Sequence, residues 1–428
     1  GDDRAYRNAD DARRGAEMRS GAQDDAPRGP LVGLRVIELG HFVAAPFCAR
    51  LLADLGAEVI KVEPPTGDPV RSWGRTKDGQ SVWWSVHGRN KLTVTANLKS
   101  PDGREVVLGL LRRSDVVIEN FRPGQLARLG LPDGLMRAAN PRLVIAHISG
   151  FGQDGPDCDR SGFGAIGEAM GGLRHLTNHA PGTTGLPPVR VGVSIGDSMA
   201  GMYAAIGVLA ALWQRDRAGG SGEGQPVDVA LTEAVLSVME AVVPEYGMFG
   251  EIREPSGARI PTTAPSSAYP SADGKWLIIA ANSQPLFARL CELMRQPDLL
   301  TDPRFADNPQ RVANVEALDS AIAAWTASMS AAEVEARLAS ANIPASRIYT
   351  AEDIANDRQY RARGMVREVD DPLLGKVLHP GVVPHLPEAQ GGVRWTGRAI
   401  GADNPAVLSG LLGLSVERIE ALKARGAI

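Results

Sequence analysis

The alternation of short apolar runs with amphipathic segments constrains the fold of this chain more than any other feature. Residues 34–39 are apolar and β-branched, as in a buried strand, residues 45–56 have a helical period ending at Gly56, and residues 57–63 indicate a second strand. This order implies a βαβ unit with a right-handed crossover. The pattern continues with strands at 91–98, 115–121 and 142–149, a helix at 102–113 and another from about Pro123. It predicts an α/β fold with a mainly parallel sheet.

With 428 residues the chain is too long for one compact core, so we expect two domains. From Pro244 to about Pro265, Pro, Gly and Ser are dense and no period survives, as in a linker. Helices are expected at 197–216, 284–295, 313–328, 331–340 and about 403–426, and strand pairs around 268–281 and 365–381. The predicted organisation is a tail at 1–30, a large Rossmann-like domain at 31–243, a linker at 244–265, a small α+β domain at 266–370 and a return segment at 371–428.

The composition is that of an ordinary globular protein, with 43% hydrophobic and 22% charged residues. A net charge of −4 provides no basic field for nucleic acid or an anionic membrane. Three widely spaced cysteines fit a reducing cytosol, so we expect a cytoplasmic location. No apolar run reaches the roughly 18–20 residues needed to cross a bilayer, and the N-terminal tail has no apolar run of a secretory signal.

The stretch "GVSIGDSMAG" holds two candidate nucleophiles. Residues 192–196 match G-x-S-x-G, the elbow that exposes a serine nucleophile, and His379 and His385 lie downstream for a triad. Asp197 stands at the start of an apolar helix, where an aspartate commonly serves as the N-cap. A carboxylate near a helix N-terminus stays ionised and can attack an activated acyl group. Spacing alone does not separate capping from catalysis.

Two other readings of the chain have little support. The turn after the first strand has one glycine where the dinucleotide fingerprint needs three, which argues against NAD. His175 and His179 have the i, i+4 spacing of metal ligands on a helix, but no carboxylate is near in the sequence, so we expect no metal.

Five motifs follow one another in order along the chain: "GLRVIELGHFVAAPFCARLLADLGAEVIKVEPPTGDPVR", "GRNKLTVTANLKSPDGRE", "DVVIENFRPGQLARLGL", "ISGFGQDGP" and "GDSMAGMYAAIGVLAAL". Together they resemble the class III CoA-transferases of the CaiB/BaiF type. This family includes formyl-CoA, carnitine and dicarboxylate CoA-transferases and α-methylacyl-CoA racemase. The resemblance runs from about residue 31 to the C-terminus.

The resemblance implies a homodimer of two interlocked rings and a catalytic aspartate at Asp197. In the implied mechanism Asp197 forms an anhydride with the donor acyl group and then a thioester with CoA. The substrates are a CoA thioester and a small carboxylic acid, and exchange of one thioester for another needs no metal or redox cofactor. The family's CoA contacts fall on His41, Phe42, Val43, Asn90, Lys91, Asn120 and Arg128. Pro64 stands where some members have an arginine.

Departures from the family pattern favour one branch. The racemase has a histidine and an aspartate where residues 162–164 read Gly-Phe-Gly, so the second acid/base is missing. The oxalate branch has a polyglycine loop that is absent from 244–270. Residues 67–74, "GDPVRSWG", resemble members that use succinyl-CoA, and Arg71 and Arg259 are candidate partners for a second carboxylate.

The sequence therefore favours a CoA-transferase with succinyl-CoA or a related donor. A CoA-thioester racemase or epimerase on the same fold, a non-catalytic acyl-CoA-binding protein and a serine hydrolase using Ser194 remain as alternatives.

Overall fold

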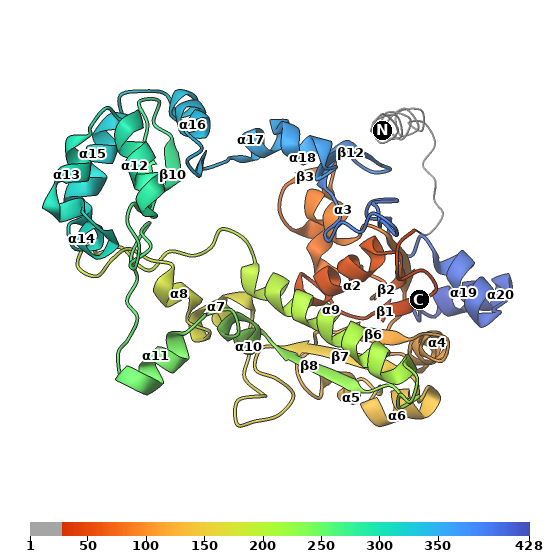
Figure 1. Ribbon diagram of the computed structural model, residues 1–428. Helices are drawn as coiled ribbons and strands as arrows, with labels where there is room; N and C mark the ends of the chain where they lie inside the picture. Colours follow the sequence, from red (N-terminus) through yellow and green to blue (C-terminus); the bar gives the residue numbers. More distant parts are fainter. Residues whose placement is uncertain (1–27) are drawn as a thin grey trace, which may run out of the picture. The chain divides into compact units, whose positions relative to one another are not determined.

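The computed structural model describes residues 28–428, so nearly all of the predicted tail at 1–30 lies outside the described residues. The chain forms two compact units (Figure 1). The first comprises the described part of Gly1–Gly167, together with Ser194–Ala234 and Gly364–Ile428, and the second comprises Glu168–Val193 and Val235–Arg363. This division differs from the predicted domains in three places. Residues 168–193 and 235–243, predicted in the large domain, group with the second unit, and residues 364–370, predicted in the small domain, group with the first.

A six-stranded parallel sheet forms the centre of the first unit. Its strands, in spatial order, are β5 (Lys91–Thr95), β2 (Glu58–Glu63), β1 (Arg35–Glu38), β6 (Val116–Glu119), β7 (Val144–Ser149) and β8 (Pro226–Ala230). All five pairings are parallel. Counted in chain order, these strands have the order 3-2-1-4-5-6 of a Rossmann fold. The predicted α/β fold with a Rossmann-like parallel sheet is confirmed.

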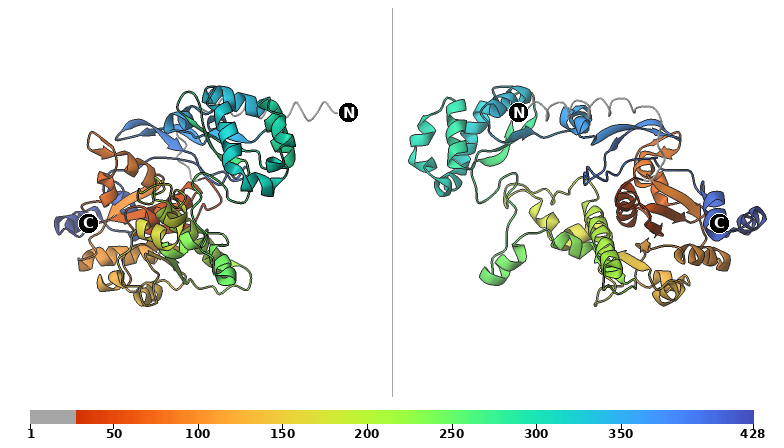
Figure 2. Two further views of the ribbon diagram at one scale, coloured as in Figure 1. Left: turned by 90° about the vertical axis from the view of Figure 1, so that its left-hand side faces the viewer. Right: turned by 45° about the vertical axis from the view of Figure 1, so that its right-hand side comes forward.

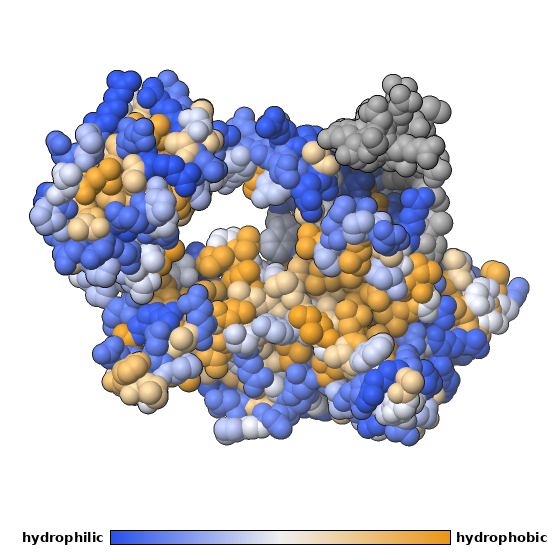
Figure 3. Space-filling model, viewed as in Figure 1, coloured by the Kyte–Doolittle hydropathy of each residue, from blue (hydrophilic) through white to orange (hydrophobic). Residues whose placement is uncertain are grey.

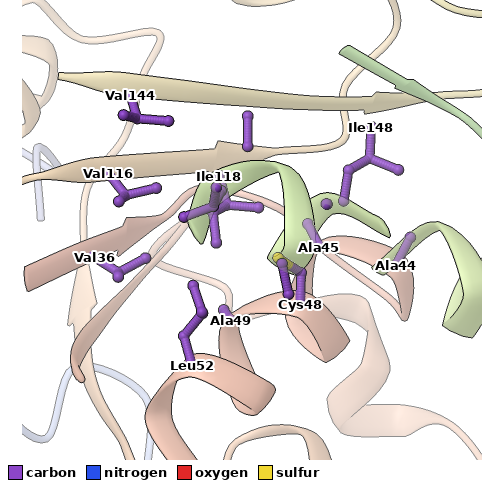
Figure 4. Close-up of a cluster of buried hydrophobic side chains, with 14 of the residues drawn as sticks. Val36, Ala44, Ala45, Cys48, Ala49, Leu52, Val116, Ile118, Val144 and Ile148 are labelled. Carbon is purple, nitrogen blue, oxygen red and sulfur yellow. The ribbon is translucent and has the colours of Figure 1, made fainter. Parts of the chain in front are cut away.

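Successive residues of each strand serve opposite faces of this sheet, which is why the strands read as continuous apolar runs. On one face Val36, Val116 and Ile118 pack against α2 (Ala44–Asp54) and α9 (Ile195–Asp216), and Figure 4 shows the side chains of α2 pointing into this cluster. On the other face Ile37 and Val117 pack against α4 (Pro101–Leu111), α5 (Gln125–Arg128) and α6 (Asp133–Ala139).

A close helix crossing fixes the start of α9. A Cβ atom added to Gly201 would lie 2.8 Å from the carbonyl oxygen of Ala44 and 3.0 Å from the Phe47 ring, so only glycine allows α9 to approach the backbone of α2 this closely. Since α2 follows directly from β1, this contact holds the first turn of α9 beside the carboxyl end of β1.

The C-terminal part of the chain returns to the first unit. The hairpin of β12 (Val366–Asp371) and β13 (Gly375–Pro380) is antiparallel, as its sequence predicts. Helices α19 (Asn404–Leu412) and α20 (Val416–Ala424) follow, and α19 packs on α4. Both views of Figure 2 show these dark-blue helices beside α4. The shorter elements of the unit are η1 (Pro69–Ser72), β3 (Thr76–Lys77), β4 (Gln80–Ser81) and α3 (Val82–His87). Two further helices, α7 (Gly164–Met170) and α10 (Leu231–Leu236), begin in the first unit and end in segments of the second.

The second unit has a three-stranded antiparallel sheet with its own core. The sheet has the order β11 (Ala345–Arg347), β10 (Trp276–Ala280) and β9 (Ser266–Pro270), and the residues of its core include Tyr269 and Phe287. The helices are α8 (Leu173–Leu176), α11 (Val242–Phe249), α12 (Gln284–Leu293), α13 (Asp298–Thr301), η2 (Pro303–Phe305), α14 (Asn308–Ala313), α15 (Val315–Thr326), α16 (Ala331–Ser340), α17 (Ala351–Asn356) and α18 (Arg358–Ala362).

One expectation about the helices is wrong. With 22 residues, α9 is long and apolar enough to cross a membrane by length and composition alone. The apolar part of this helix is longer than the sequence suggested, because Met and Gly residues precede Tyr203 and the charged residues lie near the two ends of the helix, at Asp197, Arg215 and Asp216. Its inner face belongs to the core of the first unit, and a core helix passes the same test.

Candidate active site

A cavity opens where the strand order of the parallel sheet reverses, between β1 and β6. Ligands of open α/β sheets bind at such a switch point, outside the carboxyl ends of the strands. The cavity, of about 190 Å³, receives residues from the loops after β1, β6 and β7 and from the start of α9. We call it the Asp197 cavity; it is lined by His41, Phe42, Ala44, Asn120, Phe121, Arg122, Pro123, Gln125, Ile148, Ser149, Gly150, Arg160, Gly162, Phe163, Asp197 and Leu231.

Asp197 lies in the first turn of α9, which begins two residues before the predicted start at 197. The N-cap is Ser194 and the helix begins at Ile195, so the interpretation of Asp197 as the N-cap is wrong. The reason is that the carbonyl oxygen of Ser194 accepts hydrogen bonds from both the amide and the hydroxyl of Ser198, so the first helical turn already closes between these two residues. At the third helical position, the carboxylate is still stabilised by the positive end of the helix dipole.

The Asp197 side chain rests on a glycine of the preceding helix. A Cβ atom added to Gly164 would lie 2.8 Å from Asp197 Cγ and closer still to Oδ2, which is far inside van der Waals distance. Likewise, a Cβ on Gly196 would lie 2.8 Å from the carbonyl oxygen of Gly164. The starts of α7 and α9 therefore meet at two glycines, and this contact gives the carboxylate its place in the cavity.

Asn120 fastens the turn after β1 to the end of β6. Its Oδ1 accepts from the His41 amide and its Nδ2 donates to the His41 carbonyl, both at 2.9 Å. The His41 ring also meets the Phe121 ring edge-on, with centroids 4.8 Å apart. Burial, reinforced by the positive charge of Lys61, lowers the pKa of His41, so this imidazole is neutral at neutral pH.

Buried charged side chains also stabilise the turn after β1. Lys61 Nζ donates to Asp68 Oδ2 at 2.6 Å, to Glu38 Oε1 at 2.9 Å and to the carbonyl of Gly40 at 2.5 Å. Asp68 Oδ1 in turn accepts from the amide of Phe42, which lies in the left-handed region with φ 63°. Burial favours the neutral form of Asp68, but the neighbouring Lys61 outweighs it and lowers the pKa of this carboxyl. A left-handed non-glycine residue is strained, and this network offsets the strain.

Four predicted CoA contacts lie outside the cavity. Asn90 is buried and donates to Asp54 and to the carbonyl of Gly392, both at 2.8 Å. Lys91 is fully buried 2.7 Å from Glu38 Oε2, and burial lowers its pKa to about 8. Val43 is 5% exposed at the start of α2, and Arg128 is exposed at the end of α5.

Neither arginine predicted to bind a second carboxylate lines the Asp197 cavity. Arg71 makes two hydrogen bonds, of 2.6 and 2.8 Å, to the buried carboxylate of Glu63, and its guanidinium stacks 3.6 Å above the Trp84 ring. Arg259 belongs to the second unit, where it pairs with Asp319 at 2.7 Å. Both guanidinium groups are therefore neutralised by acids of the chain itself.

A second cavity, missed by the sequence analysis, adjoins the first. This β2–β5 cavity, of about 320 Å³, lies at the carboxyl ends of β1, β2 and β5 and shares His41, Phe121 and Gln125 with the Asp197 cavity. The strand alternation contained the signal, since loops after parallel strands meet at one edge. Its other lining residues are Leu39, Val62, Glu63, Pro64, Thr66, Gly67, Pro69, Ala96, Asn97, Leu98, Lys99 and Leu129.

The histidines needed for a serine hydrolase lie elsewhere. His379 Nε2 is 3.0 Å from Ser85 Oγ, and His385 Nε2 is 2.7 Å from Gln390 Nε2. Neither lines the Asp197 cavity. Among residues 28–428, no group of three or more His, Cys, Asp or Glu side chains is arranged to hold a metal ion.

Comparison with known proteins identifies close relatives. Residues 31–404 match the model of CoA-transferase family III. The chain is 47% identical over 404 residues, 94% of its length and 99% of the relative's, to a succinyl-CoA–D-citramalate CoA-transferase of Chloroflexus aurantiacus. It is 34% identical over 414 residues, 93% of its length and 99% of the relative's, to a formyl-CoA:oxalate CoA-transferase of Streptomyces avermitilis. The crystal structure of a CAIB/BAIF family protein from Brucella suis covers 90% of this chain and 100% of its own, with a TM-score of 0.81 and 32% identity.

Proposed function

This chain belongs to CoA-transferase family III and is a CoA-transferase, and from that premise we propose that it moves CoA from succinyl-CoA or a similar donor to a carboxylic acid through covalent intermediates on Asp197. The observation that carries the proposal is the position of Asp197. Its carboxylate lies in the first turn of α9, against Gly164, in the cavity at the switch point of the sheet.

The chemistry follows from a carboxylate in a shielded cavity. Asp197 attacks the donor thioester carbonyl, which forms a mixed anhydride and expels CoA thiolate. The thiolate attacks the aspartyl carbonyl, which gives an aspartyl-CoA thioester and releases the donor acid. The acceptor carboxylate then attacks this thioester, which forms a second mixed anhydride and expels CoA thiolate again. The thiolate attacks the acceptor carbonyl of this anhydride, which gives the new CoA thioester and releases the Asp197 carboxylate. Each step exchanges one acyl bond for another, so no metal or redox cofactor is required.

The two adjoining cavities suit the two ends of a CoA thioester. We place the thioester in the Asp197 cavity, beside His41, Phe42 and Asn120, and the nucleotide in the β2–β5 cavity. The two cavities are neighbours, because His41, Phe121 and Gln125 line both of them. Pro64 lines the β2–β5 cavity and contributes apolar surface where a charged residue would bind phosphate. For Val43, Asn90, Lys91 and Arg128, contact with CoA stays a prediction.

Exposed apolar faces support the proposed homodimer. On α9, Met202, Ile206, Leu209 and Trp213 form one stripe at helical spacing and are 36–71% exposed, and Figure 3 shows hydrophobic surface in the area of α9. In the second unit α11 buries none of its residues. Apolar faces of this kind mark interaction sites, and a second copy of the chain is the partner that an isologous contact provides.

A trapping experiment tests the assignment of Asp197. Protein incubated with succinyl-CoA and quenched with hydroxylamine should carry a hydroxamate on Asp197, detected by mass spectrometry. The variant Asp197→Ala should lose both the adduct and the transfer of CoA to acceptor acids, whereas Ser194→Ala should keep them. Loss of activity in Ser194→Ala alone would instead support a hydrolase. Deuterium exchange at the α-carbon without acyl exchange would support a racemase.

A further inference from the structure

Arg160 is one of the residues that line the Asp197 cavity. We propose that its guanidinium binds the distal carboxylate of a dicarboxylic acyl group, and so selects dicarboxylic over monocarboxylic substrates. This inference rests on the proposed function. Its starting point is that Arg71 and Arg259 are engaged elsewhere, so the carboxylate partner must be sought among the residues that line the cavity.

Two arginines line the described part of this cavity, and they come from different loops. Arg122 lies between Phe121 and Gln125, which also line the β2–β5 cavity, so it stands on the side where we place the nucleotide. Arg160 and Phe163 line the Asp197 cavity alone. They precede Gly164, the residue against which the Asp197 carboxylate rests, so Arg160 belongs to the acyl side.

The guanidinium of Arg160 can exchange its present partner. Its Nη1 lies 2.9 Å from Asp157 Oδ2, but the side chains are 54% and 49% exposed, and solvent-exposed pairs of this kind are weak. The guanidinium also lies 4.8 Å from the centroid of the Phe151 ring. A ring contact of this kind restricts the orientation of the planar group and leaves edge N–H donors for a bidentate carboxylate. Arg71 cannot exchange its partner in the same way, because the carboxylate of Glu63 is buried.

The negative charge of Asp197 explains why a dicarboxylic substrate needs a cation such as Arg160 in this cavity. Asp197 is the one acidic side chain that lines the described cavity. A succinyl group brings a second carboxylate, separated from the reacting carbonyl by two methylene groups. Held near Asp197 inside the cavity without a counter-ion, the two negative charges would repel each other. Arg160 supplies that counter-ion, whereas a monocarboxylic acyl group makes no use of it.

The test compares donors in the first half-reaction, measured in a single turnover so that poor donors also give a rate. Arg160→Gln should lower the apparent second-order rate constant for succinyl-CoA about 10- to 100-fold, which corresponds to the loss of one charged hydrogen bond. The rate constant for butyryl-CoA should change by less than about 3-fold. Arg160→Lys should recover part of the loss, because the charge returns without the fork. Arg122→Gln should slow both donors alike.

Two results would overturn the role of Arg160. One is an equal loss for succinyl-CoA and butyryl-CoA in Arg160→Gln, and the other is a change of donor preference in Arg122→Gln rather than in Arg160→Gln. Failure of the proposed function has a different signature, because wild-type protein would then form no adduct on Asp197 with either donor.

Discussion

The carboxylate of Asp197 lies directly against the Cα atom of Gly164, so that no side chain fits between them. Gly164 is the first residue of α7, and its φ is not in the left-handed region. The requirement for glycine at this position is therefore one of space, not of backbone conformation. This relationship connects the packing of α7 and α9 with the position of the reacting atom.

Gly164→Ala should displace the carboxylate and lower kcat about 100-fold, because a shift of about 1 Å at a reacting group costs that much. The matched control is Gly207→Ala on α9, whose Cβ would press on Val227 of β8, a residue that does not line the Asp197 cavity. Kinetics and thermal melting of both variants separate the effects: the control should lose stability and keep most of its kcat.

A stability cycle tests the contact independently of activity. In an Asp197→Ala background the carboxylate is gone, so Gly164→Ala should lower the melting temperature less than in the wild type. Equal losses in the two backgrounds would show that Gly164 and Asp197 do not interact.

The origin of this contact shows how far the sequence leads. The parallel sheet follows from the alternation of apolar runs and helical segments, because each strand is buried on both faces and carries no polar period. The start of α9 was misplaced, since Ser194 and Asp197 are both acceptable caps and only the hydrogen bonds from Ser198 decide between them. The contact with Gly164 joins positions 33 residues apart, and no local pattern reports it.

Charged residues inside the family motifs account for the other differences between prediction and structure. Lys91 lies in a motif that the family resemblance connects with CoA, but its ammonium group is buried against Glu38, 53 positions earlier in the chain. In the structure Lys91 is the first residue of β5, at the opposite end of the strand from the carboxyl edge of the sheet. Sequence reasoning sees a cation in a family motif and cannot tell a ligand contact from an internal ion pair. Arg71 and Glu63 present the same difficulty.

Lys61→Met should destabilise the fold strongly. The substitution leaves Glu38 without one buried partner and Asp68 without its cation, and removal of one member of a buried pair costs about 3–5 kcal/mol. Urea unfolding measures the loss. A double variant, Lys61→Met with Asp68→Asn, should recover part of the stability, because it removes one of the uncompensated charges. If Lys61→Met alone is as stable as the wild type, the ion pairs of Lys61 with Glu38 and Asp68 do not stabilise the turn that contains Phe42.

The unfolding free energy should fall as the pH rises from about 6.5 toward 10, and His147 is the cause. Burial disfavours its charged form, but hydrogen bonds to Asp133 and Glu119 prevail and raise the pKa of His147 to about 10. Between its unfolded pKa of about 6.5 and this value, only the folded protein binds the proton. Stability from this group is therefore complete below pH 6.5 and lost through pH 10.

The variant His147→Gln should flatten that alkaline slope. It should also be less stable than wild type at pH 6.5, because Glu119 is buried and loses its partner. Denaturant titrations at pH 6.5, 8 and 9.5 give the comparison. If both proteins lose stability in parallel over this range, another group is responsible for the slope.

A charge placed on the exposed stripe of α9 should separate the homodimer. Ile206 is 60% exposed on the stripe, and Ile206→Glu would bury an unpaired carboxylate in an apolar contact between two copies. Sedimentation should show a dimer for wild type and a monomer for this variant. Leu135→Glu is the matched control, since Leu135 is a single exposed apolar residue on α6, and this variant should remain dimeric. A monomeric wild type that floats with neutral phospholipid vesicles, and a variant that does not, would assign the stripe to a membrane.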